Sequence, residues 1–319
     1  MQVFRGLHHP GIAPASALTI GNFDGVHRGH QAMLALLINE ARHRGVPSCV
    51  LSFEPQPRDH FARLAGQPEL APRRVATLRD KLSELERCGI DQAVIMRFDA
   101  AFAAQSPQAF IDDVLVRGLH VRYVLVGDDF CFGARRAGDY TMLDAAGARQ
   151  GFDVARMLSY EVHGLRVSSS AVREALATGD MVRAASLLGR PYSISGRVVG
   201  GYKLGKKIGF PTANIQLKHN KPPVRGIFVV QVRGLGDRPL PGVASLGTRP
   251  TLHADGKPTL EVHLFDFIRD IYGTHLRVDF LAKLREEEKY PDLGTLTRQI
   301  GRDVENAKSY FLTAEAQRR

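Results

Sequence analysis

The chain has 319 residues, of which 44% are apolar and 24% are charged, and its formal net charge is +10. These values are ordinary for a soluble globular protein, and the length favours two domains over one. No apolar run approaches the roughly 20 residues that a membrane-spanning helix needs, and the N-terminus lacks the pattern of a secretory signal. We therefore expect a cytoplasmic protein outside the membrane-spanning and secreted classes. Its three cysteines, none in Cys-x-x-Cys spacing, are then reduced thiols.

The positive charge is concentrated in the second part of the chain. Residues 191–319 hold 21 basic and 13 acidic side chains, whereas the first 190 residues hold 22 and 20 and are nearly neutral. Part of the excess is crowded into one stretch that contains Lys203, Lys206, Lys207, Lys218, Lys221 and Arg225. Such a cluster favours a polyanionic ligand, and either nucleic acid or nucleotide phosphates satisfy it.

Strand and helix patterns alternate along the first 190 residues. Short apolar runs predict buried strands at residues 17–20, 48–53, 92–96, 123–126 and 153–156. Amphipathic patterns predict helices between them, at residues 31–44, 77–88, 107–117 and 140–150. This alternation indicates an α/β fold with a doubly wound parallel sheet, which binds ligands at the carboxyl ends of its strands. We therefore expect residues 21–30 and 127–133 at the binding edge.

The pattern changes near residue 190. Two helices, at about residues 169–178 and 180–188, are followed by runs typical of antiparallel strands at 192–199, 226–232, 240–245, 259–265 and 277–281. Glycine, proline and aspartate separate these runs at short intervals, which favours a small β-barrel. A final helix is predicted at residues 293–312. We therefore predict an α/β domain in residues 1–190 and an antiparallel barrel domain with a C-terminal helix in residues 191–319.

The first candidate site is the segment of residues 21–30, GNFDGVHRGH, which follows a predicted strand and opens a helix. Its glycines allow the backbone to approach a ligand closely. The start of a helix offers unpaired N–H groups and a positive dipole end, which suit a phosphate. His27 and His30 lie three residues apart, so both imidazoles can face the same anion. This combination predicts a loop that stabilises charge on a phosphoryl group.

His-x-Gly-His is the signature of the nucleotidylyltransferase superfamily, and the longer Gly-Asn-Phe-Asp-Gly-Val-His form resembles the FMN adenylyltransferase domain of FAD synthetases. Three further segments carry this resemblance: residues 53–57 (FEPQP), 127–133 (GDDFCFG) and 168–173 (SSSAVR). Ser170 stands in place of the family's usual Thr, Val172 in place of Ile, and Cys131 where Arg is common.

The resemblance implies that the phosphate of FMN attacks the α-phosphorus of ATP and yields FAD and pyrophosphate. No covalent enzyme intermediate is needed, since positioning and charge stabilisation carry such transfers. His27 and His30 are then catalytic residues, and Asp129 and Phe130 contact the flavin. The implied site for ATP and its phosphates comprises Gly21, Asn22, Phe23, Gly29, Ser168, Ser169, Ser170 and Arg173.

The second candidate site is the segment of residues 200–215, GGYKLGKKIGFPTANI. Its glycines and lysines are typical of a loop that binds phosphate, although it lacks the Gly-x₄-Gly-Lys-Ser/Thr spacing of a P-loop. Thr212 and Asn214 are two apart at the start of a probable strand, so both side chains face the same side. Their oxygens could reach one hard cation.

Gly-Phe-Pro-Thr-Ala-Asn resembles the fingerprint of riboflavin kinases, and the similarity continues at residues 226–228, 246–251, 261–267 and 284–290. The resemblance implies that Thr212 and Asn214 hold Mg²⁺ on the ATP phosphates and that Glu261 is the general base for the riboflavin 5′-hydroxyl. It also implies ATP contacts for Gly200, Gly205, Lys206 and Thr212, and a flavin contact for Arg285. We expect Glu286, Glu287 and Glu288 to form a solvated charge run and His263 to be structural.

The whole chain thus resembles the bacterial-type bifunctional riboflavin kinase/FMN adenylyltransferases. This implies riboflavin, FMN, FAD and ATP as substrates or products, Mg²⁺ as cofactor, no nucleic acid or membrane partner, and a monomer or weak homo-oligomer. Three alternatives stay open. A basic RNA-binding module would show aromatic interleaving, which we do not find. A dinucleotide-dependent oxidoreductase would carry Gly-x-Gly-x-x-Gly after the first strand. A family member with one decayed activity would lack one set of the site residues.

Overall fold

The computed structural model describes residues 1–316, except 163, 202–204, 206–207, 219–220 and 249–257. Its contacts divide the chain into two compact units. The first comprises Met1–Pro72 and Lys81–Ser168, and the second comprises Arg73–Asp80 and Ser169–Arg319. The predicted domain boundary at residue 190 rests on the change of period alone and stays a prediction.

The first unit is built on six parallel strands in the order β1-β4-β3-β2-β5-β6. Their bounds are β1 Gln2–Arg5, β2 Ser16–Ile20, β3 Ser48–Glu54, β4 Gln92–Arg97, β5 Val121–Gly127 and β6 Asp153–Met157. From β2 the chain moves outward through β3 and β4, and then crosses to β5 on the other side of β2. The adjacent carboxyl ends of β2 and β5 are therefore the topological switch point of the sheet, where such folds bind ligands.

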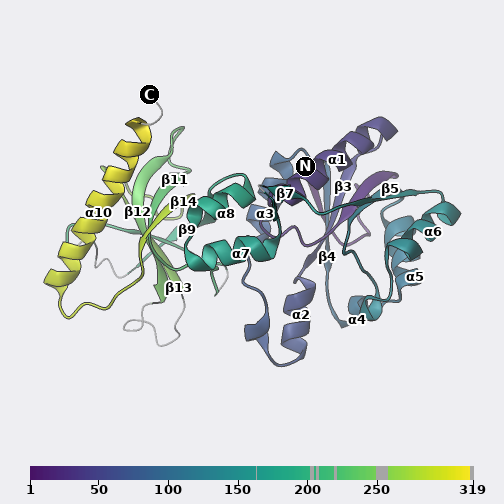
Figure 1. The fold of residues 1–319 in the computed structure, drawn as a ribbon, viewed down its shortest axis with the longest axis horizontal. Coiled ribbons are helices and arrows are strands. Elements are labelled where there is room, and N and C mark those ends of the chain that lie inside the picture. Colours follow the sequence, from purple (N-terminus) through teal and green to yellow (C-terminus); the bar gives the residue numbers. More distant parts are fainter. Residues whose placement is uncertain (163, 202–204, 206–207, 219–220, 249–257, 317–319) are drawn as a thin grey trace. The chain divides into compact units, whose positions relative to one another are not determined.

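Helices cover both faces of this sheet (Figure 1). They are α1 Arg28–Arg44, α2 Pro57–Leu64, η1 Pro68–Leu70, α3 Leu78–Arg87, α4 Ala100–Ala103, α5 Pro107–Ala109, η2 Phe110–Gly118, η3 Ala134–Arg136 and α6 Tyr140–Gln150. Alternate strand residues enter two separate cores: Leu18 packs with η2 and α6, while Ala17 packs with α1 and α3. The predicted doubly wound parallel sheet is thus confirmed.

Two elements of the first unit differ from the sequence prediction. Strand β1 was not expected, because only one of its four residues is buried and its sequence shows no clear alternation. The helix predicted at residues 107–117 begins as α5 and continues as the π-helix η2, whose apolar residues pack on the sheet. A short antiparallel pair, β7 Glu161–Val162 and β8 Leu165–Arg166, then precedes Ser168.

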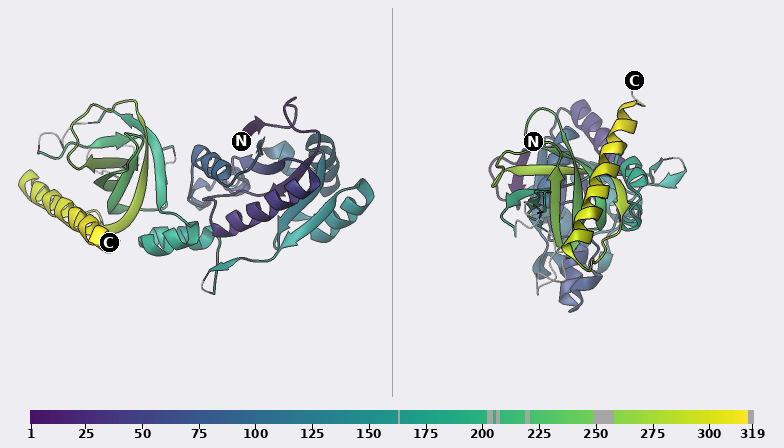
Figure 2. Two further views of the ribbon diagram at one scale, coloured as in Figure 1. Left: turned by 90° about the horizontal axis from the view of Figure 1, so that it is seen from above. Right: turned by 90° about the vertical axis from the view of Figure 1, so that its left-hand side faces the viewer.

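The second unit contains a closed antiparallel barrel in the order β10-β13-β12-β11-β14-β9, visible in Figure 2. Its strands are β9 Tyr192–Val199, β10 Ala213–Ile215, β11 Gly226–Arg233, β12 Leu240–Thr248, β13 Pro258–Leu264 and β14 His275–Arg285. The remaining helices are α7 Ser169–Thr178, α8 Met181–Leu188 and α10 Leu293–Ala316. Ala307 of α10 is buried against Val229 and Val243 of the barrel. The predicted barrel with its C-terminal helix is confirmed.

Candidate active sites

The histidine loop, residues 21–30, joins β2 to α1 at the switch point of the sheet. Two of its residues, Phe23 and Val26, have left-handed backbones with φ of 47° and 41°. Such values are unfavourable for residues with large or β-branched side chains. Both side chains are only 1% exposed and pack against Leu34 and Leu37 of α1. Burial therefore offsets the backbone strain and fixes the loop in one conformation.

His27 is the N-cap of α1 and is 5% exposed. Its Nδ1 accepts the backbone N–H of His30 at 3.3 Å. In a neutral ring this leaves the proton on Nε2, which can then donate to an anion. A side chain at Gly29 would press on this imidazole and on the carbonyl of Val167, because an ideal Cβ there lies 3.3 Å from Nδ1 and 3.4 Å from the carbonyl oxygen. The absence of a side chain at Gly29 therefore leaves room for the imidazole of His27.

His30 is stacked on His27, with ring centroids 3.6 Å apart and an interplanar angle of 15°. Burial lowers the pKa of His30 well below its ordinary value, and the charges of His27 and Lys81 lower it further. Two cations at stacking distance would repel each other, so the pair readily carries at most one positive charge. Within the described part of the chain, the inaccessible Nδ1 of His30 and Oδ1 of Asn22 have no hydrogen-bond partner. The loop thus presents neutral, buried polar atoms at the sheet edge.

Lys81 of α3 is a residue that the sequence interpretation missed. Its side chain is fully buried and its Nζ donates to Ser52 Oγ of β3 at 3.1 Å. Ser52 Oγ in turn donates to the backbone carbonyl of Asn22 at 3.4 Å. One signal could have revealed it, because Lys81 lies four residues before Leu85 and so occupies a position on the apolar face of the helix.

The aspartate loop, residues 127–133, follows β5, which pairs with β2 in parallel. The two predicted loops therefore leave neighbouring strands at the same edge, as expected. Phe132 is buried in the core, and Phe130 is half-buried and stacks on it with ring centroids 5.5 Å apart. Asp129 is exposed. The hydrogen bond from Ser159 and the nearby Arg166 lower the pKa of Asp128, which fixes the start of the loop.

The predicted phosphate segment, residues 168–173, spans the division between the units. Ser168 ends the first unit and directly follows Val167, whose carbonyl lies beside Gly29. Ser169, Ser170 and Arg173 belong to α7 of the second unit. A shared role of these side chains with the histidine loop stays a prediction.

In the barrel, three polar residues form a row across neighbouring strands. Asn214 of β10 is paired with Glu261 of β13, and Glu261 is paired with Ser245 of β12. Directly opposed residues point to the same face of a sheet. Their chain neighbours Leu260 and Val262 are buried in the barrel, whereas the three polar side chains are half-exposed. The structure thus places Asn214 and Glu261 together on the outer face.

The glycine-rich loop approaches this row closely. A side chain at Gly201 would collide with the amide of Asn214, and one at Gly205 would meet the backbone of Phe210, with Thr212 Oγ1 at 3.3 Å. His263 contributes a ring nitrogen 2.8 Å from the carbonyl of Pro211, which holds the approach to Thr212 in place, as the sequence suggested. Gly200 faces open space. The predicted ATP contact Lys206 lies outside the described residues.

The acidic run 286–288 is exposed, as the sequence predicted. Within it, Ser245 Oγ donates to Glu287 Oε1 at 3.2 Å, and a side chain at Gly247 would collide with this carboxylate. Glu287 therefore lies beside the row that contains Glu261. The charge run gave no hint of this, because the contact joins segments about 40 residues apart in the sequence.

Arg285 holds α10 to the barrel. Its Nε and Nη2 donate to the two carboxylate oxygens of buried Asp303 at 2.9 and 2.7 Å, and its Nη1 donates to the carbonyl of Glu286. These hydrogen bonds raise the pKa of the guanidinium. Such a bidentate pair is geometrically specific. The predicted flavin contact of Arg285 stays a prediction.

Thr212 and Asn214 offer a hydroxyl and an amide oxygen, which are hard ligands suited to Mg²⁺ when phosphates complete its coordination. Among the described residues, no group of three or more His, Cys, Asp or Glu is placed to bind a metal ion without such help. The hydroxyl and amide oxygens of Thr212 and Asn214 fit a hard cation whose remaining ligands are phosphate oxygens.

Comparison with known proteins covers both units. A family described as FAD synthetase matches residues 10–171, and one described as riboflavin kinase matches residues 188–311. A bifunctional riboflavin kinase/FMN adenylyltransferase of Escherichia coli K12 is 48% identical over 98% of each chain. One from Haemophilus influenzae is 46% identical over 98% of this chain and 99% of its own. The chain belongs to the bifunctional riboflavin kinase/FMN adenylyltransferase family.

A solved structure supports the fold of this family member. The crystal structure described as a macrolide-efflux protein from Streptococcus pneumoniae aligns with a TM-score of 0.77 and 26% identity, over 95% of this chain and 97% of that one. None of the helices in the described residues has the length and apolar character needed to cross a membrane. The FAD synthetase match contains the histidine loop and the aspartate loop, and the riboflavin kinase match contains Asn214, Glu261 and Glu287.

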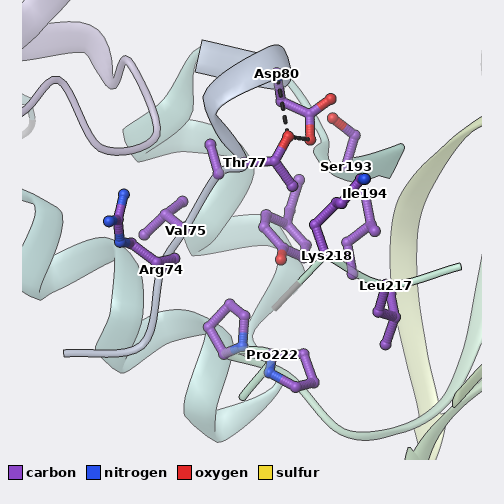
Figure 3. Close-up of a pocket in the computed structure, with 12 residues that line it drawn as sticks. Arg74, Val75, Thr77, Asp80, Ser193, Ile194, Leu217, Lys218 and Pro222 are labelled. Atoms are coloured by element: carbon purple, nitrogen blue, oxygen red, sulfur yellow. Dashed lines mark hydrogen bonds between the residues drawn. The ribbon is translucent and has the colours of Figure 1, made fainter. Parts of the chain in front are cut away.

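A small pocket of the second unit lies between the segment Arg73–Asp80 and β9 (Figure 3). Thr77 donates to Asp80 at 2.7 Å, and Asp80 also accepts a hydrogen bond from Ser195 of β9. Ser193 and Lys218 line the opening. The lining includes none of the predicted site residues, so we assign no ligand to it.

Proposed function

We propose that this chain makes FMN from riboflavin and ATP on its barrel, and makes FAD from FMN and ATP on its α/β unit. The observation that carries the proposal is the presence of two built sites in one family member. One is the pair of stacked histidines at the switch point, and the other is the in-register row of Asn214 and Glu261. Each site matches one of the two reactions in the family's description.

For the kinase reaction, Glu261 takes the proton of the riboflavin 5′-hydroxyl as the oxygen attacks the γ-phosphorus of ATP. The bond to the β-phosphate oxygen then breaks and ADP leaves. Asn214 and Thr212 would hold Mg²⁺, which would neutralise phosphate charge when it is bound with ATP. The loop glycines 200 and 205 and Lys206 approach the phosphates. The close contacts of Gly201 and Gly205 with Asn214 and with the segment before Thr212 support this arrangement.

For adenylyl transfer, a phosphate oxygen of FMN attacks the α-phosphorus of ATP and pyrophosphate leaves. The positive end of α1 and the Nε2–H of His27 face the phosphates, with His30 stacked behind. Gly21, Asn22 and Phe23 shape the nucleotide side of the loop. Ser168, Ser169, Ser170 and Arg173 supply hydroxyl and guanidinium donors to the leaving group. The exposed Asp129 and half-buried Phe130 on the adjacent strand end make a suitable flavin contact.

The proposal extends to the setting of the enzyme. Soluble small-molecule substrates and reduced cysteines suit a cytoplasmic protein, and the lysines of the barrel serve ATP in preference to nucleic acid. A monomer or weak homo-oligomer suffices, because each reaction has its catalytic groups on one chain. Sedimentation analysis and a competition assay with RNA test these points.

The direct test is a time course with riboflavin, ATP and Mg²⁺, with the flavins separated by chromatography. FMN should appear first and FAD should follow. A second reaction started from FMN tests the α/β unit alone. If folded protein leaves riboflavin unchanged, the kinase assignment is wrong, and if it leaves FMN unchanged, the adenylyltransferase assignment is wrong.

A further inference from the structure

Lys81 carries a charge into the interior of the first unit. Its side chain is 0% exposed, and a buried ammonium is costly unless hydrogen bonds and opposite charges compensate for it. The apolar contacts of α3 with the core come from Leu82 and Leu85. Lys81 is one of the largest fully buried side chains of the protein, and it brings a charged end into this interior.

The ammonium is connected to the histidine loop by a chain of hydrogen bonds. Nζ of Lys81 donates to Ser52 Oγ at 3.1 Å, and Ser52 Oγ donates to the carbonyl oxygen of Asn22 at 3.4 Å. Ser52 is itself completely buried near the carboxyl end of β3. These hydrogen bonds link α3 through β3 of the sheet to Asn22, the second residue of the loop. A buried, connected polar network of this kind restricts the groups that it joins.

The same ammonium acts on His30 through space. His27 from its own loop and Lys81 from α3 are charged groups that act on this ring. Asp24 is the acidic residue buried in the loop, and β3 contributes the uncharged Ser52. After burial, His27 and then Lys81 are the causes that lower the pKa of His30. A neutral imidazole can donate or accept one hydrogen bond without carrying an extra proton to the phosphates.

We propose that Lys81 is a positioning residue for FMN adenylyl transfer, which braces the backbone at Asn22 through Ser52. Its charge also disfavours a proton on the neighbouring His30. The inference rests on the proposed role of His30. It adds a residue outside the recognised motifs and gives its buried charge a task. Removing the charge should therefore change the pH dependence of FAD formation as well as its rate.

The test uses the full-length protein with isotope-labelled histidine, followed by NMR over pH 5 to 8, with the His30 signal assigned from His30→Asn. In Lys81→Met the titration midpoint of His30 should rise, because a nearby like charge is lost. The acid limb of the pH–rate profile for FAD formation from FMN should move to higher pH together with this midpoint. Ser52→Ala interrupts the hydrogen bonds between Lys81 and Asn22 but keeps the charge of Lys81. It should therefore lower the rate of FAD formation and leave the acid limb of its pH profile in place.

Two controls accompany these variants. Arg87→Met removes an exposed cation from the same helix, where the side chain is 62% exposed, and should leave the His30 titration unchanged. FMN formation from riboflavin, measured on the same samples, should keep its wild-type pH profile in every variant.

A folded Lys81→Met protein with a wild-type His30 titration and a wild-type acid limb would overturn the proposal. If this variant does not fold, the NMR titration of His30 in the wild-type protein provides the test. A His30 that is charged at pH 6 without ATP is incompatible with the proposal. If His30→Asn forms FAD at the wild-type rate, the proposed role of His30 fails, while the titration still reports on the electrostatic effect of Lys81.

Discussion

The two candidate sites are built in opposite ways. The histidine loop is a buried segment whose side chains Phe23 and Val26 are locked into the core and whose imidazoles cap and stack within one turn. The second site, the row of Asn214, Glu261 and Ser245, lies on the half-exposed outer face of the barrel. Asn214 and Glu261 meet there because β10 and β13 are in register. The first site is local in sequence, and the second joins residues 47 positions apart.

This difference teaches where each site is vulnerable. A local, buried loop depends on the charges and hydrogen bonds around it, because a buried polar group has no water to replace a lost partner. A row across strands depends on register, and its half-exposed groups can be hydrated when a neighbour is removed. Substitutions in the barrel row should therefore change only the rate of the reaction. Substitutions in the histidine loop should change the rate, the protonation of its histidines and the local stability together.

The largest expected effect is the loss of kinase activity on removal of the base. Glu261→Gln keeps the shape of the side chain but cannot take the hydroxyl proton, so FMN formation should fall by about 10²- to 10⁴-fold. FAD formation from added FMN should stay at the wild-type rate. The measurement is a steady-state assay of each reaction, with flavins resolved by chromatography. Equal loss of both activities would contradict the separation of the two sites.

The reciprocal change tests the α/β unit. His30→Ala removes a ring that stacks on His27 at the N-terminal end of α1. FAD formation from FMN should fall by about 10²- to 10³-fold, as when a preorganised charge-stabilising group is lost. FMN formation from riboflavin should be unchanged, as measured in the same pair of assays. A variant that still forms FAD normally would remove His30 from the catalytic residues.

A smaller effect is expected from the carboxylate that the sequence did not single out. Glu287→Gln weakens the hydrogen bond with Ser245, the residue opposite Glu261, so kcat/KM for riboflavin should fall by about tenfold, the loss of one charged hydrogen bond. Glu286→Gln is the matched control, since the exposed Glu286 pairs with Lys283. Its kinetics should match the wild type. Equal values for both variants would return Glu287 to the solvated charge run.

The smallest effect concerns stability against pH. The pKa of His30 is depressed in the folded chain, so its contribution to the free energy of unfolding is present above the ordinary histidine value of about 6.5. That contribution is lost as the pH falls toward the lowered folded value. Hydrogen exchange of peptides from β2 and α1 should show this loss between pH 7 and pH 5. His30→Asn should flatten the dependence, whereas peptides of the barrel should behave alike in both proteins.

Much of the molecule could be predicted from local pattern. The apolar runs gave five of the six strands of the first sheet, and the motifs located the histidine loop and the strand that carries Asn214. The spacing of apolar residues and the residue types typical of turns extend over only a few positions, so they can be recognised in a single sequence. Strand β1 escaped because a parallel edge strand with one buried residue is held by pairing with β4, about 90 residues later.

What the sequence by itself determined is most of the order of helices and strands and the motifs that mark the two candidate sites. Tertiary structure alone decided which distant residues became their neighbours. Lys81 lies near the histidine loop because it donates to Ser52, and Glu287 lies near Glu261 because it accepts from Ser245. Arg285 anchors α10 because it pairs with Asp303. The physical reason is that charged side chains are long and readily exposed in an unfolded chain. Only the packed fold fixes whether each one meets water or a buried partner.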